Sequence, residues 1–490
     1  MTSARQPPAN PDKPNVIVVL CDQLRSFEVG CYGNDVIRTP HIDRLAAQGV
    51  RFEHAVSNNP VCMPARSCLL SGQYSRTCQG FLNNYSGTLP DGTTGMPEYP
   101  EDERRFLLDP TLPDQLKVAG YETRLIGKWH VQPSPPRVGF DHSLYPRVHH
   151  RHTGQVFVEG DPPDRWLDDG SEGDVIEGFS VDHEATAVRD FLDRTDTDRP
   201  FFLYYNISPP HMPLDDAPEE YLRMYSPDEI PIRDNVWRDD GQLPVDERWF
   251  RIYLWDFLFY QEQQPHTGRL PDGFTLRHLI ALYYGLTTWV DDQIGRLLEG
   301  LRANGLDENT IVVFLSDHGD NLGSHGAFNK GRLIEESIRV PMIWWAPGRF
   351  APSVREREVA SLIDVMPTIL DLVGGETPDT TQGRSLAQAL LGTGPGPDHA
   401  FIETSMGEIG LRTRTHLRGL QLGDDRRQIT HDPGCLFDLT SDPCELTNLA
   451  TAAPDPKLEQ RLRDWHADTP IRDAPAMPGG GAGLRTDRAR

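Results

Sequence analysis

The sequence is short of positive charge and of long apolar runs. Its 490 residues include 48 Lys and Arg against 73 Asp and Glu, a formal net charge of -25. A surface of this sign repels nucleic acid and anionic lipid, which excludes both as broad binding partners. A small anionic substrate stays allowed, because a few basic groups in a cleft can hold it. The first apolar run, residues 16–21, is too short for a membrane span or a signal-peptide core.

Paired cysteine motifs are also missing. The seven cysteines form an odd set without zinc-like CxxC pairs, which is typical of reduced thiols rather than of a disulfide framework. Residues 1–14 are polar and proline-rich, and we expect a disordered leader without a secretion signal. The sequence therefore predicts a cytoplasmic protein.

Several catalytic motifs are absent as well. The chain has no GxSxG, HExxH or P-loop sequence. A cysteine phosphatase needs an arginine six positions after its catalytic cysteine, but the residue six positions after Cys62 is Cys68. That thiolate mechanism is excluded.

Short β-branched runs alternate with helical patterns, which indicates βαβ units. The predicted strands are residues 16–20, 122–126, 201–207, 311–315 and 342–345, each apolar enough to be covered on both faces. The predicted helices are residues 41–48, 111–119, 182–192 and 275–301. The pattern predicts an α/β fold with a large, doubly wound, mainly parallel sheet flanked by helices.

The composition also divides the chain. We expect a catalytic domain over residues 15–375, a linker over 376–399 and a smaller α+β subdomain over 400–470, with an antiparallel sheet and a helix at 456–466. Residues 471–490 are predicted to form a disordered tail. Residues 140–179 are rich in Gly, Asp and Pro, which predicts an elaborated loop.

Polar side chains stand at the ends of four predicted strands. Asp22, Lys128, His211 and Asp317 each follow a buried run. The carboxyl ends of parallel strands share one edge of an open sheet, where ligands bind. We therefore expect these four residues to contribute to one site.

The most specific signal is the pentapeptide from Cys62 to Arg66, Cys-Met-Pro-Ala-Arg. It resembles the C-x-P-x-R signature of type I sulfatases in the alkaline-phosphatase superfamily. In that family a formylglycine-generating enzyme oxidises the cysteine to formylglycine, whose hydrated form attacks the ester. Other blocks resemble the family in the same order: residues 15–23, 39–43, 49–52, 127–130, 209–211, 316–319, 329–331 and 436–439. The resemblance extends over about residues 14–449 and implies hydrolysis of a small sulfate ester.

The resemblance implies a metal site. Asp22, Asp317, His318 and an oxygen on the modified Cys62 would bind one divalent cation. Such a cation lowers the pKa of the hydrated aldehyde and makes a nucleophile at neutral pH.

The resemblance also assigns catalytic roles. Arg66 would anchor the nucleophile, and Lys128 and Lys330 would hold the oxygens of the transferred group. His211 would protonate the leaving oxygen, and His130 would assist release of the inorganic anion.

Two departures from the common arylsulfatase pattern bear on metal and substrate. Gln23 stands where many sulfatases carry a second Asp, and His318 stands where they carry Asn. One carboxylate fewer and one nitrogen donor favour manganese over calcium, although both stay candidates. The same pairings resemble choline sulfatases and phosphonate monoester hydrolases, so hydrolysis of phosphonate monoesters or phosphodiesters stays an alternative. Asn83 resembles a substrate-contacting Asn of those branches, with a plain turn residue as the alternative.

Other candidates rank lower. The histidines between positions 149 and 152 are more typical of a solvated loop than of a metal tract. The aromatic-rich residues 237–260 favour packing under a long loop over a wall of the substrate cleft or an oligomer contact. Asp320 and His325 are assigned supporting roles, and the chain is compatible with homo-oligomer formation.

Overall fold

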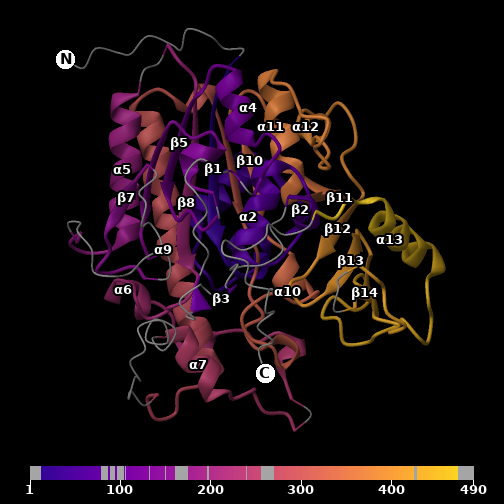
Figure 1. Ribbon diagram of the computed structural model, residues 1–490. Helices are drawn as coiled ribbons and strands as arrows, with labels where there is room; N and C mark the ends of the chain where they lie inside the picture. Colours follow the sequence, from indigo (N-terminus) through magenta and orange to yellow (C-terminus); the bar gives the residue numbers. More distant parts are fainter. Residues whose placement is uncertain are drawn as a thin grey trace.

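A nine-stranded sheet forms the centre of the larger part of the molecule (Figure 1). Its strands are β1 (Asn15–Asp22), β2 (Val50–Val56), β5 (Glu122–Gly127), β6 (His142–Pro146), β7 (Phe157–Glu159), β8 (Phe201–Pro210), β9 (Thr310–Ser316), β10 (Met342–Trp345) and β11 (Ser353–Ser361). They lie in the order β11-β2-β10-β9-β1-β8-β5-β6-β7. β10 and β7 run antiparallel to their neighbours, and the other pairings are parallel. The predicted mainly parallel sheet is confirmed.

The computed structural model describes residues 13–78, 104, 106–131, 133–148, 151–160, 175–195, 198–238, 240–254, 270–423 and 427–472, with the backbone of a two-stranded sheet, β3 (Gly87–Thr88) and β4 (Thr94–Gly95). Of the segments predicted to be disordered, residues 1–14 and 471–490, this part of the chain includes only 13–14 and 471–472. Lys13 there donates to the Ala119 carbonyl, and the Arg472 backbone N–H donates to the Arg76 carbonyl. None of the helices within it combines the length and the apolarity that crossing a bilayer requires.

Helices cover both faces of the large sheet (Figure 1). Those that pack on it are α1 (Pro40–Gln48), α2 (Cys62–Ser71), α4 (Leu112–Val118), α5 (Ser180–Arg194), α9 (Leu276–Ala303) and α11 (Val365–Val373). Alternate residues of β1 serve the two layers: Ile17 and Val19 pack with α1, α5 and α9, whereas Val18 and Leu20 pack with α2, α4 and α11. This period of two on a strand buried on both faces gives the doubly wound arrangement.

All five predicted strands are present, and four were not predicted. β6 and β7 fall within residues 140–179, so the expected loop is partly wrong. β7 pairs with β6 through Leu144 to Pro146, which closes that edge of the sheet with a short antiparallel strand. The remaining helices are short: α3 (Ser75–Cys78), α6 (Glu219–Leu222), α7 (Glu247–Leu254), α10 (Glu335–Ile338) and α12 (Ala387–Leu390).

A four-stranded antiparallel sheet forms the C-terminal part, as predicted (Figure 1). Its strands are β12 (His399–Glu403), β13 (Glu408–Thr413), β14 (His416–Gln421) and β15 (Cys435–Asp438), and α13 (Pro456–Asp468) packs on them. Buried ion pairs join this part to the catalytic part: Arg76 with Glu403, and Arg412 with Glu335, each at 2.8 Å. Breaking one such pair would leave an uncompensated buried charge, so the two parts are held firmly together.

One contact at this junction predicts acid sensitivity. The Arg412 guanidinium donates to His54 Nδ1 at 3.4 Å. Burial, followed by the charges of Arg412 and Arg339, lowers the pKa of His54 to about 4. A histidine whose folded pKa lies below its unfolded value takes up its proton in the unfolded chain first, so stability falls as the pH drops from about 6.5 toward 4.

We expect His54 alone to cost about 2 kcal/mol of unfolding free energy between pH 7 and pH 4.5. The measurement is urea unfolding of the wild type and His54→Gln at both pH values, and the variant should lose this part of the pH dependence. His142→Gln, at an exposed β6 position, is the matched control. Equal pH dependence in His54→Gln and the wild type would show that the histidine is not responsible.

Candidate active site

Four neighbouring strands deliver the predicted polar residues to one edge of the sheet. β9, β1, β8 and β5 are adjacent and parallel, and Asp317, Asp22, His211 and Lys128 stand at or just beyond their carboxyl ends. The β1–β8 register shifts at Asp22, which pairs with Pro210 and so lies beside the turn that carries His211. All four side chains are buried. The prediction that they share one edge is confirmed.

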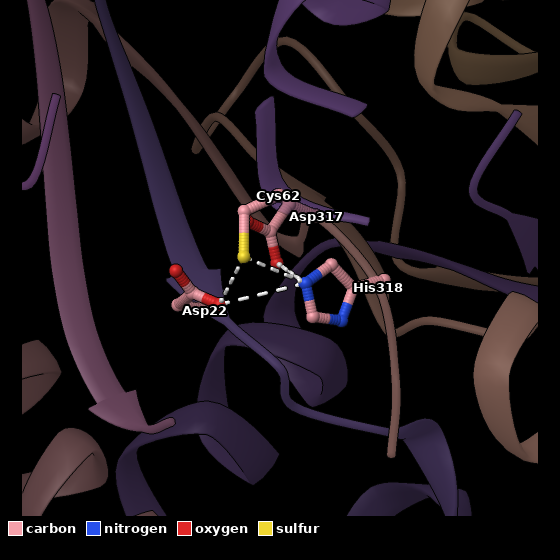
Figure 2. Close-up of side chains that lie close together, drawn as sticks. All are labelled: Asp22, Cys62, Asp317 and His318. Atoms are coloured by element: carbon pink, nitrogen blue, oxygen red, sulfur yellow. Dashed lines mark hydrogen bonds and ion pairs between the residues drawn. The ribbon is translucent and has the colours of Figure 1, made fainter. Parts of the chain in front are cut away.

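Cys62 is the first residue of α2, and its side chain lies at this edge of the sheet. Its Sγ lies 3.4 Å from Asp22 Oδ1 and 3.2 Å from His318 Nε2. Figure 2 shows the Cys62, Asp22, Asp317 and His318 side chains converging on one point. The residue here is the unmodified thiol, and Figure 2 draws its sulfur beside the two carboxylates and the imidazole. The N-terminal position on a helix favours an anion at this atom.

Arg66 lies one helical turn after Cys62 and points to the same side. Its Nε donates to Asp317 Oδ2 at 3.0 Å, and one terminal nitrogen donates to Asp22 Oδ2 at 3.2 Å. The other terminal nitrogen donates to the Lys128 carbonyl at 3.2 Å. One fully buried guanidinium therefore ties α2 to the ends of β1, β9 and β5.

The same contacts leave a set of donor atoms for a metal. Asp22 Oδ1 and Asp317 Oδ1 each lie 3.6 Å from His318 Nε2. His318 Nδ1–H donates to the Gly319 carbonyl at 2.8 Å, which leaves the Nε2 lone pair facing the two carboxylates. Together with residue 62, these ligand atoms lie within 4.8 Å of one another. Two carboxylates and one imidazole suit a hard or borderline divalent cation.

The charge states fit metal binding. Burial alone would raise the pKa of Asp22, but Lys128, His211, Arg66 and Lys330 outweigh burial and hold that pKa well below its ordinary value. Burial lowers the pKa of His318 even though two carboxylates face it. An ionised carboxylate and a neutral imidazole are the forms that ligate metals.

Two lysines, of five in the whole chain, reach the site. Lys128 forms an ion pair with Asp22 Oδ2. Lys330 Nζ lies 3.0 Å from Cys62 Sγ and donates to Gln23 Oε1 at 2.7 Å. Burial would lower the pKa of Lys330, but Cys62 and Asp22 beside it raise that pKa above its ordinary value. Lys330 is partly exposed, so the site opens toward solvent on its side.

Both predicted catalytic histidines lie at the same edge. His211 Nδ1–H donates to the Met212 carbonyl at 2.7 Å, which places the lone pair on Nε2. Burial, with Lys330 and Lys128 adding to it, holds the pKa of His211 well below its ordinary value. His130 is buried with φ +42°, in the left-handed region that non-glycine residues seldom occupy. Such backbone strain is concentrated at functional sites.

A second ring of contacts surrounds Lys330, and sequence reasoning identified only Asp320 of it, as a residue with a supporting role. Gln23 turns its side chain away from the metal donors: Nε2 donates to Asp320 Oδ2 and, at 3.3 Å, to Asn329 Oδ1. The Tyr253 hydroxyl donates to Asp320 Oδ1 and accepts from the Asn329 backbone N–H. Only the place of Gln23 directly after Asp22 could have signalled its role, because Tyr253 comes from the aromatic insertion, far away in the chain.

Two sequence candidates remain to be placed. Asn83, like His149 and His150, lies outside the described residues. His152 is fully buried and packs edge-on against Trp289, so its assignment to a solvated loop is wrong. In the aromatic insertion Phe250 and Tyr253 are buried, which confirms packing for these two members.

Carboxylates, an imidazole and cationic side chains thus gather at the carboxyl edge of an open, mainly parallel sheet, an arrangement that can hold a divalent cation and a small anion. A family model described as Sulfatase matches residues 14–375. The chain belongs to the sulfatase family, which comprises sulfuric ester hydrolases.

The relatives are similar over nearly their whole lengths. An arylsulfatase of Clostridium perfringens is 29% identical, with 89% of this chain and 90% of the relative covered. An N-acetylglucosamine-6-O-sulfatase of Bacteroides thetaiotaomicron is 27% identical, with 94% and 88% covered.

Solved structures share the fold. YidJ of Bacteroides fragilis superposes with a TM-score of 0.73 at 27% identity, covering 96% of this chain and 98% of that chain. A phosphonate monoester hydrolase of Agrobacterium radiobacter superposes with a TM-score of 0.66 at 22% identity, covering 93% of this chain and 96% of that chain. At this identity the similarity shows a shared fold and nothing about activity.

The ring around Lys330 gives a prediction by double-mutant cycle. Gln23→Glu removes the amide that donates to Asp320 and puts two buried carboxylates together, so we expect a loss of about 1–3 kcal/mol in unfolding free energy. Asp320→Asn in the same chain restores one donor and one acceptor. Urea unfolding of both single variants and the double variant should show a favourable coupling of about 0.5–3 kcal/mol. Simple additivity would mean that the two side chains do not act together.

Proposed function

We propose that this protein hydrolyses sulfate esters with a formylglycine made from Cys62. The observation that carries the proposal is the position of Cys62 Sγ. It lies at hydrogen-bonding or ligand distance from Asp22, His318 and Lys330, at the head of the helix whose Arg66 holds the carboxylates. An oxygen at this place would touch a bound cation on one side and a cationic side chain on the other.

The thiol itself is a poor nucleophile in this setting. Burial and the charge of Asp22 raise the pKa of Cys62 to about 11, although Lys330 and Lys128 oppose them. In the absence of a bound cation the thiol is therefore protonated at neutral pH. This supports replacement of the sulfur by an oxygen nucleophile over cysteine chemistry.

Hydrated formylglycine with a divalent cation supplies a hydroxyl nucleophile at neutral pH. Asp22, Asp317 and His318 would hold the cation, and Arg66 keeps both carboxylates in place. Lys330, beside residue 62 and partly exposed, is placed to meet the non-bridging oxygens of an incoming sulfate group. These contacts strengthen as negative charge moves onto those oxygens in the transition state.

The histidines handle protons. His211 is neutral in the substrate-free site, since burial and two lysines lower its pKa. An anionic substrate between Lys128 and Lys330 offsets those charges and raises the pKa of His211, so Nε2 takes up a proton from solvent when the substrate binds. His211 then donates its proton to the leaving oxygen, and His130 assists release of sulfate.

The finer assignments follow from the donor set. We infer Mn²⁺ over Ca²⁺ as the cation, because His318 supplies nitrogen and Gln23 is engaged by Lys330 and Asp320. The alternative reaction is hydrolysis of phosphonate monoesters or phosphodiesters at the same site, which the Gln23 and His318 pairings support. A formylglycine-generating enzyme as partner, a cytoplasmic location and homo-oligomer formation stay predictions.

The test compares protein produced with and without a formylglycine-generating enzyme. Mass spectrometry of the tryptic peptide that contains residue 62 gives the aldehyde fraction, and the hydrolysis rate of an aryl sulfate gives activity. We expect the rate to rise in proportion to the aldehyde fraction and to vanish in Cys62→Ala, which should fold normally. Full activity in protein that holds only the thiol would overturn the proposal.

The role of His211 predicts a dependence on the leaving group. His211→Ala should slow sulfate esters of alkyl alcohols by ~10²–10⁴ and spare activated aryl sulfates, whose leaving oxygens need little protonation. Kinetics with an alkyl and a nitrophenyl ester measure both effects, and His183→Ala on α5 is the control. An equal loss on both esters would reassign His211 to binding.

A further inference from the structure

A second group of potential ligands lies where the C-terminal part meets the catalytic part. His325 stands in the short helical turn Ser324–Gly326, Glu336 in α10, and Glu445 in the segment after β15. One ligand atom from each lies within 4.8 Å of the others. Neither the family's active site nor the contacts around Lys330 include these three residues.

Each carboxylate in the group has one oxygen engaged and one without a hydrogen-bond partner. Glu336 Oε1 accepts from Arg233 at 2.7 Å and from Asn235 at 2.8 Å. Glu445 Oε2 accepts from the Glu335 backbone N–H at 3.0 Å. Within the described residues, Glu336 Oε2 and Glu445 Oε1 are buried and have no partner. The two residues are 0% and 3% exposed, so bulk water does not solvate these oxygens.

The surrounding charges do not balance. Glu335 pairs with Arg412 at 2.8 Å, and Glu336 pairs with Arg233. Glu445 forms no ion pair with a described residue, and the carboxylates of Glu335 and Glu336 are close enough to repel its charge. A buried carboxylate in this position requires either a bound cation or a proton.

We propose that His325, Glu336 and Glu445 bind a divalent transition-metal ion that clamps the two parts of the chain together. One imidazole nitrogen and two carboxylate oxygens are ligands that zinc and manganese accept. His325 is exposed, so an ion can enter on its side and the imidazole can adjust to it. The cation neutralises Glu445 and satisfies both unpartnered oxygens.

The position of this clamp connects it to the active site. The chain between His325 and Glu336 contains Asn329 and Lys330, so the metal would fix both ends of the loop that carries Lys330. Glu445 would couple that loop to the C-terminal part. The proposal does not depend on formylglycine or on the identity of the substrate.

The experiment counts ions. Protein stripped with a chelator is reloaded separately with Zn²⁺ or Mn²⁺, desalted and analysed for metal per chain, and Tm is recorded before and after loading. The variant is His325→Asn, since asparagine tolerates the left-handed backbone found here, φ +52°. Glu445→Gln keeps the size of the side chain and removes its charge. His318→Ala is the matched control at the active site.

With Zn²⁺ or with Mn²⁺, we expect two ions per chain in the wild type and one in either His325→Asn or His318→Ala. The double variant that combines His318→Ala with His325→Asn should bind none. Metal should raise the Tm of His318→Ala and leave that of the double variant unchanged. If His325→Asn holds as many ions as the wild type, the proposal is wrong. It is equally wrong if Glu445→Gln keeps the wild-type ion count and gains stability, because a proton then occupies the site. Should Glu445→Gln fail to fold, the His325→Asn count decides.

Discussion

The buried ion pairs of Arg66 are the interaction on which the site depends. Asp22 and Asp317 end neighbouring parallel strands, and side by side they would repel each other away from water. Arg66 takes one oxygen from each and leaves the other oxygen directed at His318 and residue 62. Removing one partner of a buried pair typically costs about 3–5 kcal/mol. The position of Arg66 four residues after Cys62 thus brings both carboxylates and residue 62 together at one point.

The electrostatics of the site are opposite to those of the whole protein. The chain carries a formal charge of -25, yet at this edge two carboxylates face the three cationic side chains Arg66, Lys128 and Lys330. The centre is therefore positive before any cation binds. A low-dielectric setting strengthens this local field, which selects an anionic substrate while the negative surface disfavours nucleic acid.

The sequence allowed prediction of the elements that are apolar throughout. β1, β8, β9 and β10 are buried along their whole lengths, and β5 is buried from Leu125 onward, so their hydrophobic runs can be recognised from the sequence alone. In β2 and β11, apolar residues alternate with charged ones such as Arg51 and Glu53, and β11 lies at the edge of the sheet. Which of their residues are buried therefore depends on neighbouring elements that are known only from the fold. The same limit applied to the site. Residues at strand ends could be predicted, because parallel strands share an edge, whereas Tyr253 and Glu445 reach their clusters through tertiary packing.

We propose that one metal-supported nucleophile hydrolyses sulfate esters, and phosphoryl transfer at the same site is the competing reaction. Sulfate monoesters and phosphate diesters both carry one negative charge, so the two lysines accept either. The discriminating feature is room for a second organic arm beside residue 62. The most direct measurement is kcat/KM of the aldehyde-bearing protein on a matched panel of sulfate monoesters, including an aryl sulfate and an amino-sugar 6-sulfate, phosphonate monoesters and phosphate diesters. The account predicts the highest value for a sulfate ester; a phosphonate or phosphodiester that exceeds every sulfate ester would contradict it.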